Sequence, residues 1–136
     1  MKKNIIITIG IIFFTIFIIT LACVPKILKE YENKSNSVVK NNCKIIVQDV
    51  INIKDMKKLS EKSKEFVEKY NETYKNPITN KESAFTVDKK CIGCVSVSYD
   101  ENTKSINVTG YDKDLEILCR TVVKPPSYVT YEREEK

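Results

Sequence analysis

The sequence predicts an α+β fold made of an N-terminal transmembrane helix, an amphipathic helical stem and a C-terminal antiparallel β-meander. Three observations lead to this prediction. Residues 5–24 contain no charged side chain, residues 25–75 place apolar side chains three and four positions apart, and residues 84–131 alternate apolar and polar side chains. A spacing of three to four residues is typical of a helix with one buried face, and a spacing of two is typical of a strand.

Residues 5–24 are predicted to cross a membrane once. As a helix they are about 30 Å long, at roughly 1.5 Å per residue, which matches the hydrocarbon core of a bilayer. A short basic N-terminus, residues 1–4, comes directly before them and contains Lys2 and Lys3. This order is typical of a signal-anchor, so we expect the protein in the cell membrane, with the lipid bilayer as a partner.

Two alternative interpretations remove the apolar run from the mature protein. The segment Thr20-Leu21-Ala22-Cys23 resembles a lipobox, with Ala22 before the cysteine but Thr20 where leucine is usual. Cys23 is therefore a lipidation candidate, and lipidation would make the protein a lipoprotein binding module. Plain secretion is the other alternative, but the apolar part of a cleaved signal peptide is usually about 7 to 15 residues long. The length of the run favours the anchor.

The lysines around the apolar run bear on membrane orientation. They flank it on both sides, and more of them follow the run than precede it. Lysine counts alone favour a cytoplasmic C-terminal domain. We nevertheless expect an extracytoplasmic domain, because a short basic start is typical of a signal-anchor and the cysteines described below favour an oxidising compartment.

Two amphipathic helices are predicted within residues 25–75. Each has an apolar face that we expect to pack into a core, with charged residues on the opposite side. The first face consists of Val39, Cys43, Ile46, Val47, Val50 and Ile53, and the second of Met56, Leu59, Phe66, Val67, Tyr70 and Tyr74.

Several residues are expected to divide this stem. Pro25 lacks an amide hydrogen and is expected to kink a helix or to start a new one. Asn36 or Ser37 is expected to cap the first amphipathic helix, and Asp55 to cap the second. The second helix should end at Asn76, since the residue before a proline disfavours helical geometry. Residues 76–83 are then a connecting loop.

The C-terminal part of the chain is predicted to form an antiparallel sheet with one buried face. A short strand at residues 84–87 is followed by three alternating strands, with turns at 100–104 and 110–114, and by an edge strand at 127–131. The side chains expected on the buried face are Val95, Val97, Tyr99, Ile106, Val108, Leu115, Ile117, Cys119, Thr121 and Val123. This face should pack against the amphipathic helices, and residues 132–136 should form a charged tail.

Composition excludes several classes of function. The net charge is +5, and the 21 basic and 18 acidic residues beyond Val24 leave +3 there. Charges of both signs are interspersed, unlike the clustered basic surface of a nucleic-acid-binding protein. There is no histidine and there are only three glycines, which excludes histidine-dependent catalysis and glycine-rich nucleotide loops. We therefore expect no enzyme activity, cofactor, metal or nucleic-acid partner. The excess of lysine over arginine favours an AT-rich, bacterial source.

Four cysteines lie beyond the apolar run: Cys43, Cys91, Cys94 and Cys119. An even number of cysteines in a small extracytoplasmic domain is typical of disulfides, so two bridges are predicted. Each bridge would contribute about 2–4 kcal/mol to the stability of the domain. Four cysteines allow three pairings, and their spacing does not choose among them.

The same cysteines permit other interpretations. Cys91 and Cys94 form a Cys-x-x-Cys motif, which would serve as the redox pair of a membrane-tethered thiol-disulfide oxidoreductase. That motif normally opens a helix, whereas here it precedes a predicted strand. All four cysteines together have the ligand count of a structural zinc site, although one Cys-x-x-Cys and two scattered thiols are a weak signature. Free thiols are the remaining alternative.

Two features link the chain to a known layout. Pro25 lies just past the apolar run, and residues 75–81 place Asn-Pro-x-Thr between the predicted helices and the sheet. This layout resembles type IV pilin-like proteins and pseudopilins, whose stem often kinks at such a proline and whose Gram-positive members include some with Asn-Pro-x-Thr in that loop. The family's processing site is absent, because Gly10 lies inside the apolar run and no glutamate precedes Glu30.

The sequence therefore predicts a structural or protein-interaction role for a small extracytoplasmic domain on a single-pass anchor. A protein partner in the cell envelope is expected. The resemblance implies, more specifically, a component of a filament or a secretion system.

Overall fold

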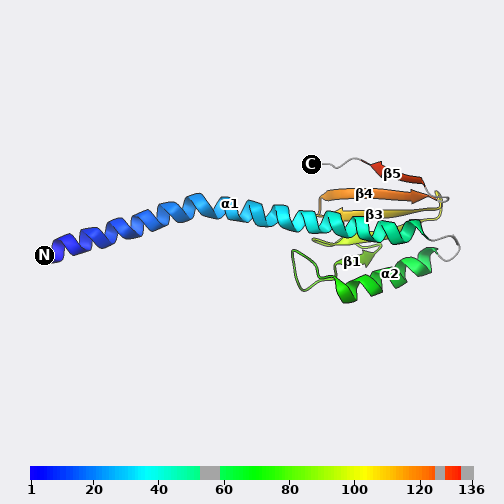
Figure 1. The fold of residues 1–136 in the computed structure, drawn as a ribbon, viewed down its shortest axis with the longest axis horizontal. Helices are drawn as coiled ribbons and strands as arrows, with labels where there is room; N and C mark the ends of the chain where they lie inside the picture. The colour runs from blue at the N-terminus through cyan, green and yellow to red at the C-terminus, as the bar shows by residue number, and fades with distance from the viewer. Residues whose placement is uncertain (53–58, 125–127, 133–136) are drawn as a thin grey trace. The chain divides into compact units, whose positions relative to one another are not determined.

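The computed structural model describes residues 1–52, 59–124 and 128–132, which form an α+β protein (Figure 1). The chain divides into two compact units, Met1–Lys34 and Ser35–Lys136. The first unit is helical, and the second combines helices with a sheet. The α+β class predicted from the two periodicities is confirmed.

Helix α1 (Lys2–Ile51) is continuous and contributes residues to both units. Of the two alternatives at Pro25, the start of a new helix is therefore wrong, and the expected cap at Asn36 or Ser37 is wrong as well. A proline removes one hydrogen bond from a helix interior, but an established helix gains one bond for each residue added. Ser35 is buried, and its hydroxyl donates to the carbonyl of Pro77 at 3.4 Å. The residue just before the expected cap is therefore inside the helix and contacts the loop that contains Pro77.

In the first unit, the apolar run is a regular part of α1. Its large apolar side chains are 42–71% exposed. The three threonines of the run, Thr8, Thr15 and Thr20, each donate their hydroxyl to the carbonyl four residues earlier at 2.8 Å. Within the described part of the chain, α1 is the one helix long and apolar enough to cross a membrane.

The described residues of the second unit form a sheet with the strand order β1-β2-β3-β4-β5 (Figure 1). The strands are β1 (Phe85–Val87), β2 (Val95–Asp100), β3 (Ser105–Tyr111), β4 (Ile117–Lys124) and β5 (Tyr128–Glu132). Consecutive strands from β2 to β5 pair antiparallel, whereas β1 pairs parallel to β2. The sheet is therefore mixed, and the expectation of an antiparallel pairing for the first short strand is wrong.

The parallel pairing of β1 follows from the connection after it. Residues 88–94 return the chain so that Val95 lies opposite Phe85 at the start of both strands. On the other edge of β1, the side-chain amide of Asn71 donates to the carbonyl of Phe85 and accepts from its amide, both at 2.9 Å. Asn71 thus bonds to this short edge strand as a neighbouring strand would, and so stabilises it.

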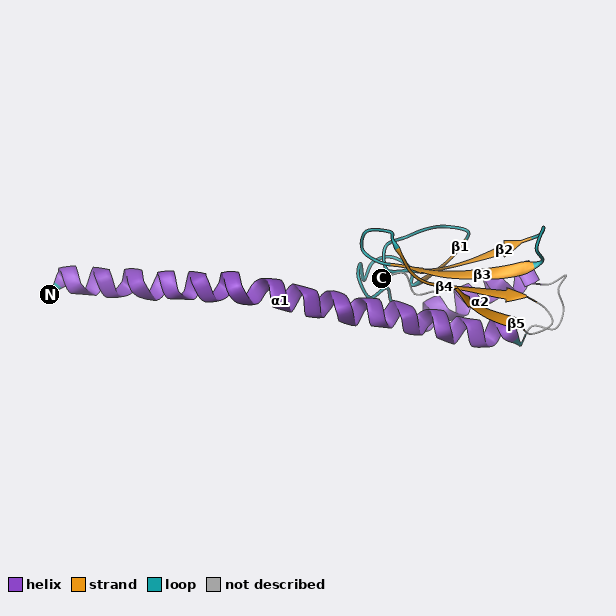
Figure 2. Cartoon of the chain, turned by 90° about the horizontal axis from the view of Figure 1, so that it is seen from above, coloured by secondary structure: helices purple, strands orange, loops and turns teal. Residues whose placement is uncertain are grey.

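Both helices of the second unit pack on the same face of the sheet (Figure 2). The apolar faces predicted for the stem and for the sheet meet there and form the core. Its buried members are Val39, Cys43, Ile46, Val47 and Val50 from α1, Val67 from α2 (Leu59–Thr73), Ala84, and Phe85, Val95, Val97, Ile106, Val108, Leu118 and Val123 from the sheet. Each fully buried aliphatic side chain contributes about 1.5–3 kcal/mol through the hydrophobic effect.

Aromatic rings connect α2 to β1. The ring of Tyr70 lies 5.3 Å from that of Phe85 and 5.6 Å from that of Tyr74. The hydroxyl of Tyr70 also donates to the carboxylate of Asp49 on α1. Burial, followed by the contact with Asp49, raises the pKa of Tyr70. Tyr70 therefore joins α2 to both α1 and the sheet.

A β-bulge in β4 changes which side chains of that strand are buried. The register of β3 and β4 shifts after Gly110, and Leu118 is the extra residue on β4. Leu118 is buried in the core, whereas Leu115 is 44% exposed and Ile117 is half-buried. The predicted place of Leu115 and Ile117 on the buried face is therefore wrong. The extra residue at the bulge reverses which side chains before it would face the core.

The end of α2 also differs from the prediction. The helix ends at Thr73 and not at Asn76. Lys75 instead forms an isolated antiparallel bridge with Ser83, so the chain is already extended before the proline. The loop predicted at 76–83 thus starts from a β-bridge.

Other predicted boundaries shift by a few residues. β3 continues to Tyr111, so the second turn starts after the expected Gly110. β5 ends at Glu132, which the prediction placed in the tail. Predictions for Ile53, Asp55, Met56, Ser127 and residues 133–136 lie outside the described residues.

Candidate functional site

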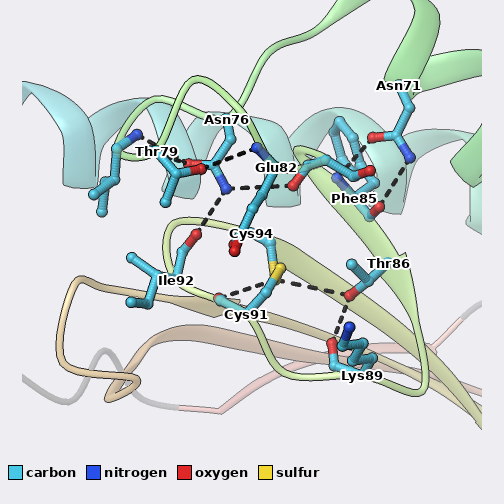
Figure 3. Close-up of a disulfide and its surroundings, with 12 residues drawn as sticks. Asn71, Asn76, Thr79, Glu82, Phe85, Thr86, Lys89, Cys91, Ile92 and Cys94 are labelled. Atoms are coloured by element: carbon cyan, nitrogen blue, oxygen red, sulfur yellow. Dashed lines mark hydrogen bonds between the residues drawn. A yellow bond between two sulfur atoms is a disulfide. The ribbon is translucent and has the colours of Figure 1, made fainter.

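The four cysteines of the second unit occupy two separate places. Cys91 and Cys94 are joined by a disulfide in the loop between β1 and β2, with their Cα atoms 5.5 Å apart (Figure 3). Cys43 on α1 and Cys119 on β4 carry thiols. Of the three pairings left open by the sequence, the structure therefore holds one bridge, inside the Cys-x-x-Cys motif. The prediction of two bridges is not met in this state.

The side chain of Asn76 holds the disulfide loop in place (Figure 3). Asn76 is completely buried, and its Nδ2 donates to the carbonyls of Ile92 at 2.7 Å and Ser83 at 3.3 Å. Its Oδ1 accepts from the amides of Ile78 at 2.9 Å and Thr79 at 3.0 Å. One side chain thus satisfies four main-chain groups and ties two loops together.

Gly93 allows the disulfide loop to approach Asn76. Its φ of +67° lies in the left-handed region that favours glycine. A Cβ at this position would lie 2.6 Å from Oδ1 of Asn76 and 3.0 Å from the side chain of Ile78. The close contact between the two loops therefore requires glycine here.

The two bridged sulfurs differ in their access to solvent. Cys94 is completely buried, and its Sγ lies 3.7 Å from Oγ1 of Thr86. The Thr86 hydroxyl donates to the carbonyl of Lys89 at 2.5 Å, which fixes the threonine side chain (Figure 3). Cys91 is half-buried. An incoming thiolate would therefore reach the sulfur of Cys91 before that of Cys94.

Cys91 lies in the wall of an open cleft of about 450 Å³. The other residues that line this cleft are Lys81, Glu82, Ser83, Lys89, Lys90, Ile92 and Leu115. Three lysines against one glutamate give the cleft a positive charge, and a cation beside a cysteine favours its thiolate once a disulfide is reduced. The exposed Leu115 adds an apolar contact at the same place.

Tyr111 lies next to this cleft. The ammonium of Lys90 is 5.6 Å from the centroid of the Tyr111 ring, within the range of a cation–π contact. Burial raises the pKa of Tyr111, while the nearby charge of Arg120 opposes that shift. Tyr111 is therefore neutral at physiological pH and acts as a platform for the lysine.

The other two cysteines meet between α1 and the sheet. Cys43 is buried in the core and Cys119 is half-buried, and the two thiols are hydrogen-bonded to each other. A Cβ on Gly110 would lie 2.8 Å from the Sγ of Cys43 and 2.7 Å from the Sγ of Cys119. The side-chain contact with Cys119, followed by burial, raises the pKa of the Cys43 thiol.

The two cysteine pairs lie on opposite faces of the sheet. Cys119 on β4 pairs with Gly110 on β3, and Gly110 pairs with Val95 on β2. These three positions lie on the face of the sheet that the helices cover. Cys94 directly precedes Val95 and contacts Thr86, so alternation places its side chain on the other face. A zinc site made of all four cysteines does not fit this arrangement. Among the described residues, no three cysteine, aspartate or glutamate side chains are placed to hold a metal ion.

Cys23, the lipidation candidate, is exposed on α1 in the first unit. Sequence reasoning did not find the contributions of Asn76, Lys81, Lys89 and Lys90. The lysines are unremarkable in a lysine-rich chain. For Asn76 the position before Pro77 marked a loop, but nothing in the pattern indicated a buried amide.

Comparisons with known proteins identify no relative: no protein-family model, curated protein or solved structure matches the chain. Function is therefore inferred from the residues of the chain itself.

Proposed function

We propose that the protein is a single-pass membrane protein whose second unit is a small extracytoplasmic interaction domain. The observation that carries this proposal is the uncharged run of about 20 exposed apolar residues in α1. In water such a run would expose far more apolar surface than a soluble monomer usually does. Lipid would cover it.

The threonines of the run support the same proposal. A hydroxyl group in hydrocarbon needs a hydrogen-bond partner inside the protein. Thr8, Thr15 and Thr20 each have one in the carbonyl of the preceding turn. The run therefore brings no unsatisfied hydroxyl into a bilayer.

Alkaline carbonate extraction of membranes from expressing cells tests the anchor. We expect the protein to stay in the membrane pellet. A variant with Ile12→Lys and Phe13→Lys should be released, since each lysine at the centre of a spanning helix costs about 2.5–3.5 kcal/mol. Ile12→Leu with Phe13→Leu is the matched control and should stay in the pellet. Wild-type protein in the supernatant would contradict the anchor.

The intact mass of the extracted protein separates an anchor from a lipoprotein. An anchor retains the full chain of 15.7 kDa. A lipoprotein would begin at Cys23 and carry a diacylglyceryl adduct, and the variant Cys23→Ser would then lose the lipid. A shorter mass without lipid would favour plain secretion.

Membrane orientation is tested at Glu30, which is exposed on α1 after the apolar run. We expect a Glu30→Cys variant in a Cys23→Ser background to react with a membrane-impermeant maleimide in intact cells. Labelling only after the cells are opened would place the second unit in the cytoplasm.

An exposed apolar stripe on α1 supports a protein partner. Ile27 and Tyr31 lie one turn apart and are 63% and 61% exposed, and Leu28 beside them is 62% exposed. Such a stripe beyond a membrane span is typical of helix–helix contact. A pilin-like assembly through a second copy of the chain is the specific form of partner that we propose.

A photo-crosslinking residue at Tyr31 tests this contact in membranes. We expect an adduct of twice the monomer mass. The same residue at Lys29, which points away from Tyr31 on the helix, is the matched control and should give little adduct. An adduct of another mass would point to a different protein partner, and equal yields at both positions would argue against a specific face.

A second candidate function is thiol-disulfide exchange at Cys91 and Cys94. It is favoured by the access of Cys91 from a cleft with three lysines, together with the burial of Cys94. In this arrangement Cys91 would form the mixed disulfide with a substrate, and Cys94 would release it. The cleft lysines would favour the thiolate that attacks.

Reduction of a model disulfide substrate by the dithiol form of the protein tests the second candidate. The assay uses a background with Cys43→Ser and Cys119→Ser, because the thiols of Cys43 and Cys119 could also reduce the substrate. In this background we expect Cys91→Ser to abolish the activity and Cys94→Ser to trap a mixed disulfide. The background protein itself is the matched control and should retain the activity. Equal loss in all three proteins would indicate unfolding, and no activity in the wild type would remove this candidate.

A further inference from the structure

We propose that Cys43 and Cys119 are a second reversible disulfide site, which bonds α1 to β4 when a disulfide-bearing oxidant reaches the second unit. The partner is identified by its chemistry: a low-molecular-weight or protein disulfide that exchanges with thiols. The proposal does not depend on the membrane anchor or on exchange at Cys91.

The position of the two sulfurs carries the proposal. Both lie within 3 Å of the point that a Cβ of Gly110 would occupy. Glycine leaves this space empty, so a thiol from the helix and a thiol from the strand enter it together. Cγ1 of Val39 lies 2.8 Å from the same point and closes the space on the helix side. The sulfurs are thus held side by side by two regular elements.

The register of the sheet fixes which cysteines can react. Cys119 lies directly opposite Gly110 and on the face that the helices cover. Cys91 and Cys94 are bonded to each other, and Cys94 lies on the other face of the sheet. Cys43 therefore has Cys119 as its neighbouring thiol, and closure needs no exchange with the first bridge.

The chemistry proceeds in two exchange steps. The thiolate of the half-buried Cys119 attacks the oxidant disulfide, forms a mixed disulfide and releases one thiolate. Cys43 then loses its proton and attacks the Cys119 sulfur. This attack forms the Cys43–Cys119 disulfide and releases the other half of the oxidant as a thiolate. Two protein thiols are oxidised and one oxidant disulfide is reduced to two thiols. Cys43 is buried in the core, where a thiolate is hard to form, so the second step should be the slower one.

A tryptic map of the full chain in detergent, after treatment with oxidised glutathione, tests the proposal. Trypsin cuts after Lys40, Lys44, Lys113 and Arg120, so Cys43 and Cys119 fall on the peptides 41–44 and 114–120. Cys91 and Cys94 stay together on the peptide 91–104, and Cys23 lies on a fourth peptide. We expect 41–44 linked to 114–120 in the oxidised sample, and dithiothreitol to separate them.

Several results would overturn the proposal. One is a Cys43 that remains fully alkylatable after oxidation of the folded protein. Another is a link from 41–44 to 91–104, which would show that the first bridge exchanges. A third is a Cys119 that stops at the glutathione adduct, which would show that the two sulfurs cannot close.

Two variants separate the geometry from the mere presence of thiols. Gly110→Ala keeps both cysteines but fills the space between them, and we expect closure at least about tenfold slower than in the wild type. Val122→Ala lies on the same pair of strands, outside the core cluster, and should close at the wild-type rate. If Gly110→Ala fails to fold, thermal melting of the wild type still tests the proposal. The closed form should melt about 10 °C or more above the open form, because the bond closes a long loop.

Discussion

The two halves of α1 carry similar apolar residues in different surroundings. Up to Lys34, the large apolar side chains of the helix are exposed. From Ser35 onwards the residues Val39, Ile46 and Val50 are buried against the sheet. Secondary structure is the same in both halves, so helix formation alone does not tell them apart. What differs is the source of the apolar surroundings, which the protein supplies for the second half and a bilayer would supply for the first.

The sharpest test of this difference is the same substitution in both halves. Ile46→Ala removes a completely buried side chain and should lower the free energy of unfolding of the second unit by about 2–5 kcal/mol. Ile12→Ala, on the exposed half, should leave it unchanged. Urea titration in detergent, followed by tyrosine fluorescence, measures both variants. A similar loss in both would mean that the two halves unfold together.

The glycines allow a second comparison of this kind. Gly93→Ala places a Cβ against Asn76 at a positive φ, and should cost about 2 kcal/mol of stability. Gly10→Ala adds a Cβ that meets nothing within 4 Å. Thermal unfolding of the second unit should therefore shift for Gly93→Ala only. An unchanged midpoint would show that the disulfide loop relaxes away from Asn76.

Asn71 tests how far the edge of the sheet depends on a side chain. Asn71→Ala removes both hydrogen bonds to Phe85, and should lower the free energy of unfolding by about 1–2 kcal/mol. Asn71→Asp keeps the acceptor but loses the donor, and should be at least as destabilised at neutral pH. Amide hydrogen exchange at Phe85 reports the effect directly. Unchanged protection there would show that β1 is held by its pairing with β2 alone.

Asn42 offers an opposite effect in the buried half of α1. It is 2% exposed, and its Nδ2 has no hydrogen-bond partner among the described residues. Leucine has a similar shape to asparagine and carries no polar group. We therefore expect Asn42→Leu to raise the free energy of unfolding of the second unit by about 1 kcal/mol. Denaturant midpoints measure the change. A loss of stability would mean that the amide has a structural role that the apolar side chain cannot replace.

The smallest expected effect concerns Asp100, the last residue of β2 before the turn to β3. The side chain of Thr103, then the amide of Asn102, lowers the pKa of Asp100 below its usual value. A lowered pKa in the folded state means that the aspartate stabilises the fold above the unfolded pKa of about 4. This contribution is lost as the pH falls through the folded pKa. The stability difference between the wild type and Asp100→Ala should therefore be larger at pH 6 than at pH 3.

Patterns of residues predicted much of this fold. The spacing of Val39, Ile46 and Val50 identified the face of α1 that is buried, and the alternation of Val95 and Val97 identified the face of β2 that covers it. These predictions succeed because burial acts on each side chain through its local period. They are independent of the direction of a strand or of where a helix starts.

Other features depend on contacts that the local pattern does not contain. Helix α1 continues through Ser35, whose hydroxyl donates to the carbonyl of Pro77, far along the chain. The parallel β1 depends on the loop that Asn76 holds. In the same way, the cysteine count predicted bridges, but the space at Gly110 that brings Cys43 and Cys119 together arises only from the register of β3 and β4.

The side chain of Asn71 also limits how the sheet can grow. The edge of a sheet normally offers free main-chain groups to a strand of another molecule, which is a common route to aggregation. At β1 the outward amide and carbonyl of Phe85 are already bonded to Asn71. A foreign strand would have to displace this amide before it could add there. At high local concentration these domains would thus be protected at this edge against joining sheet to sheet.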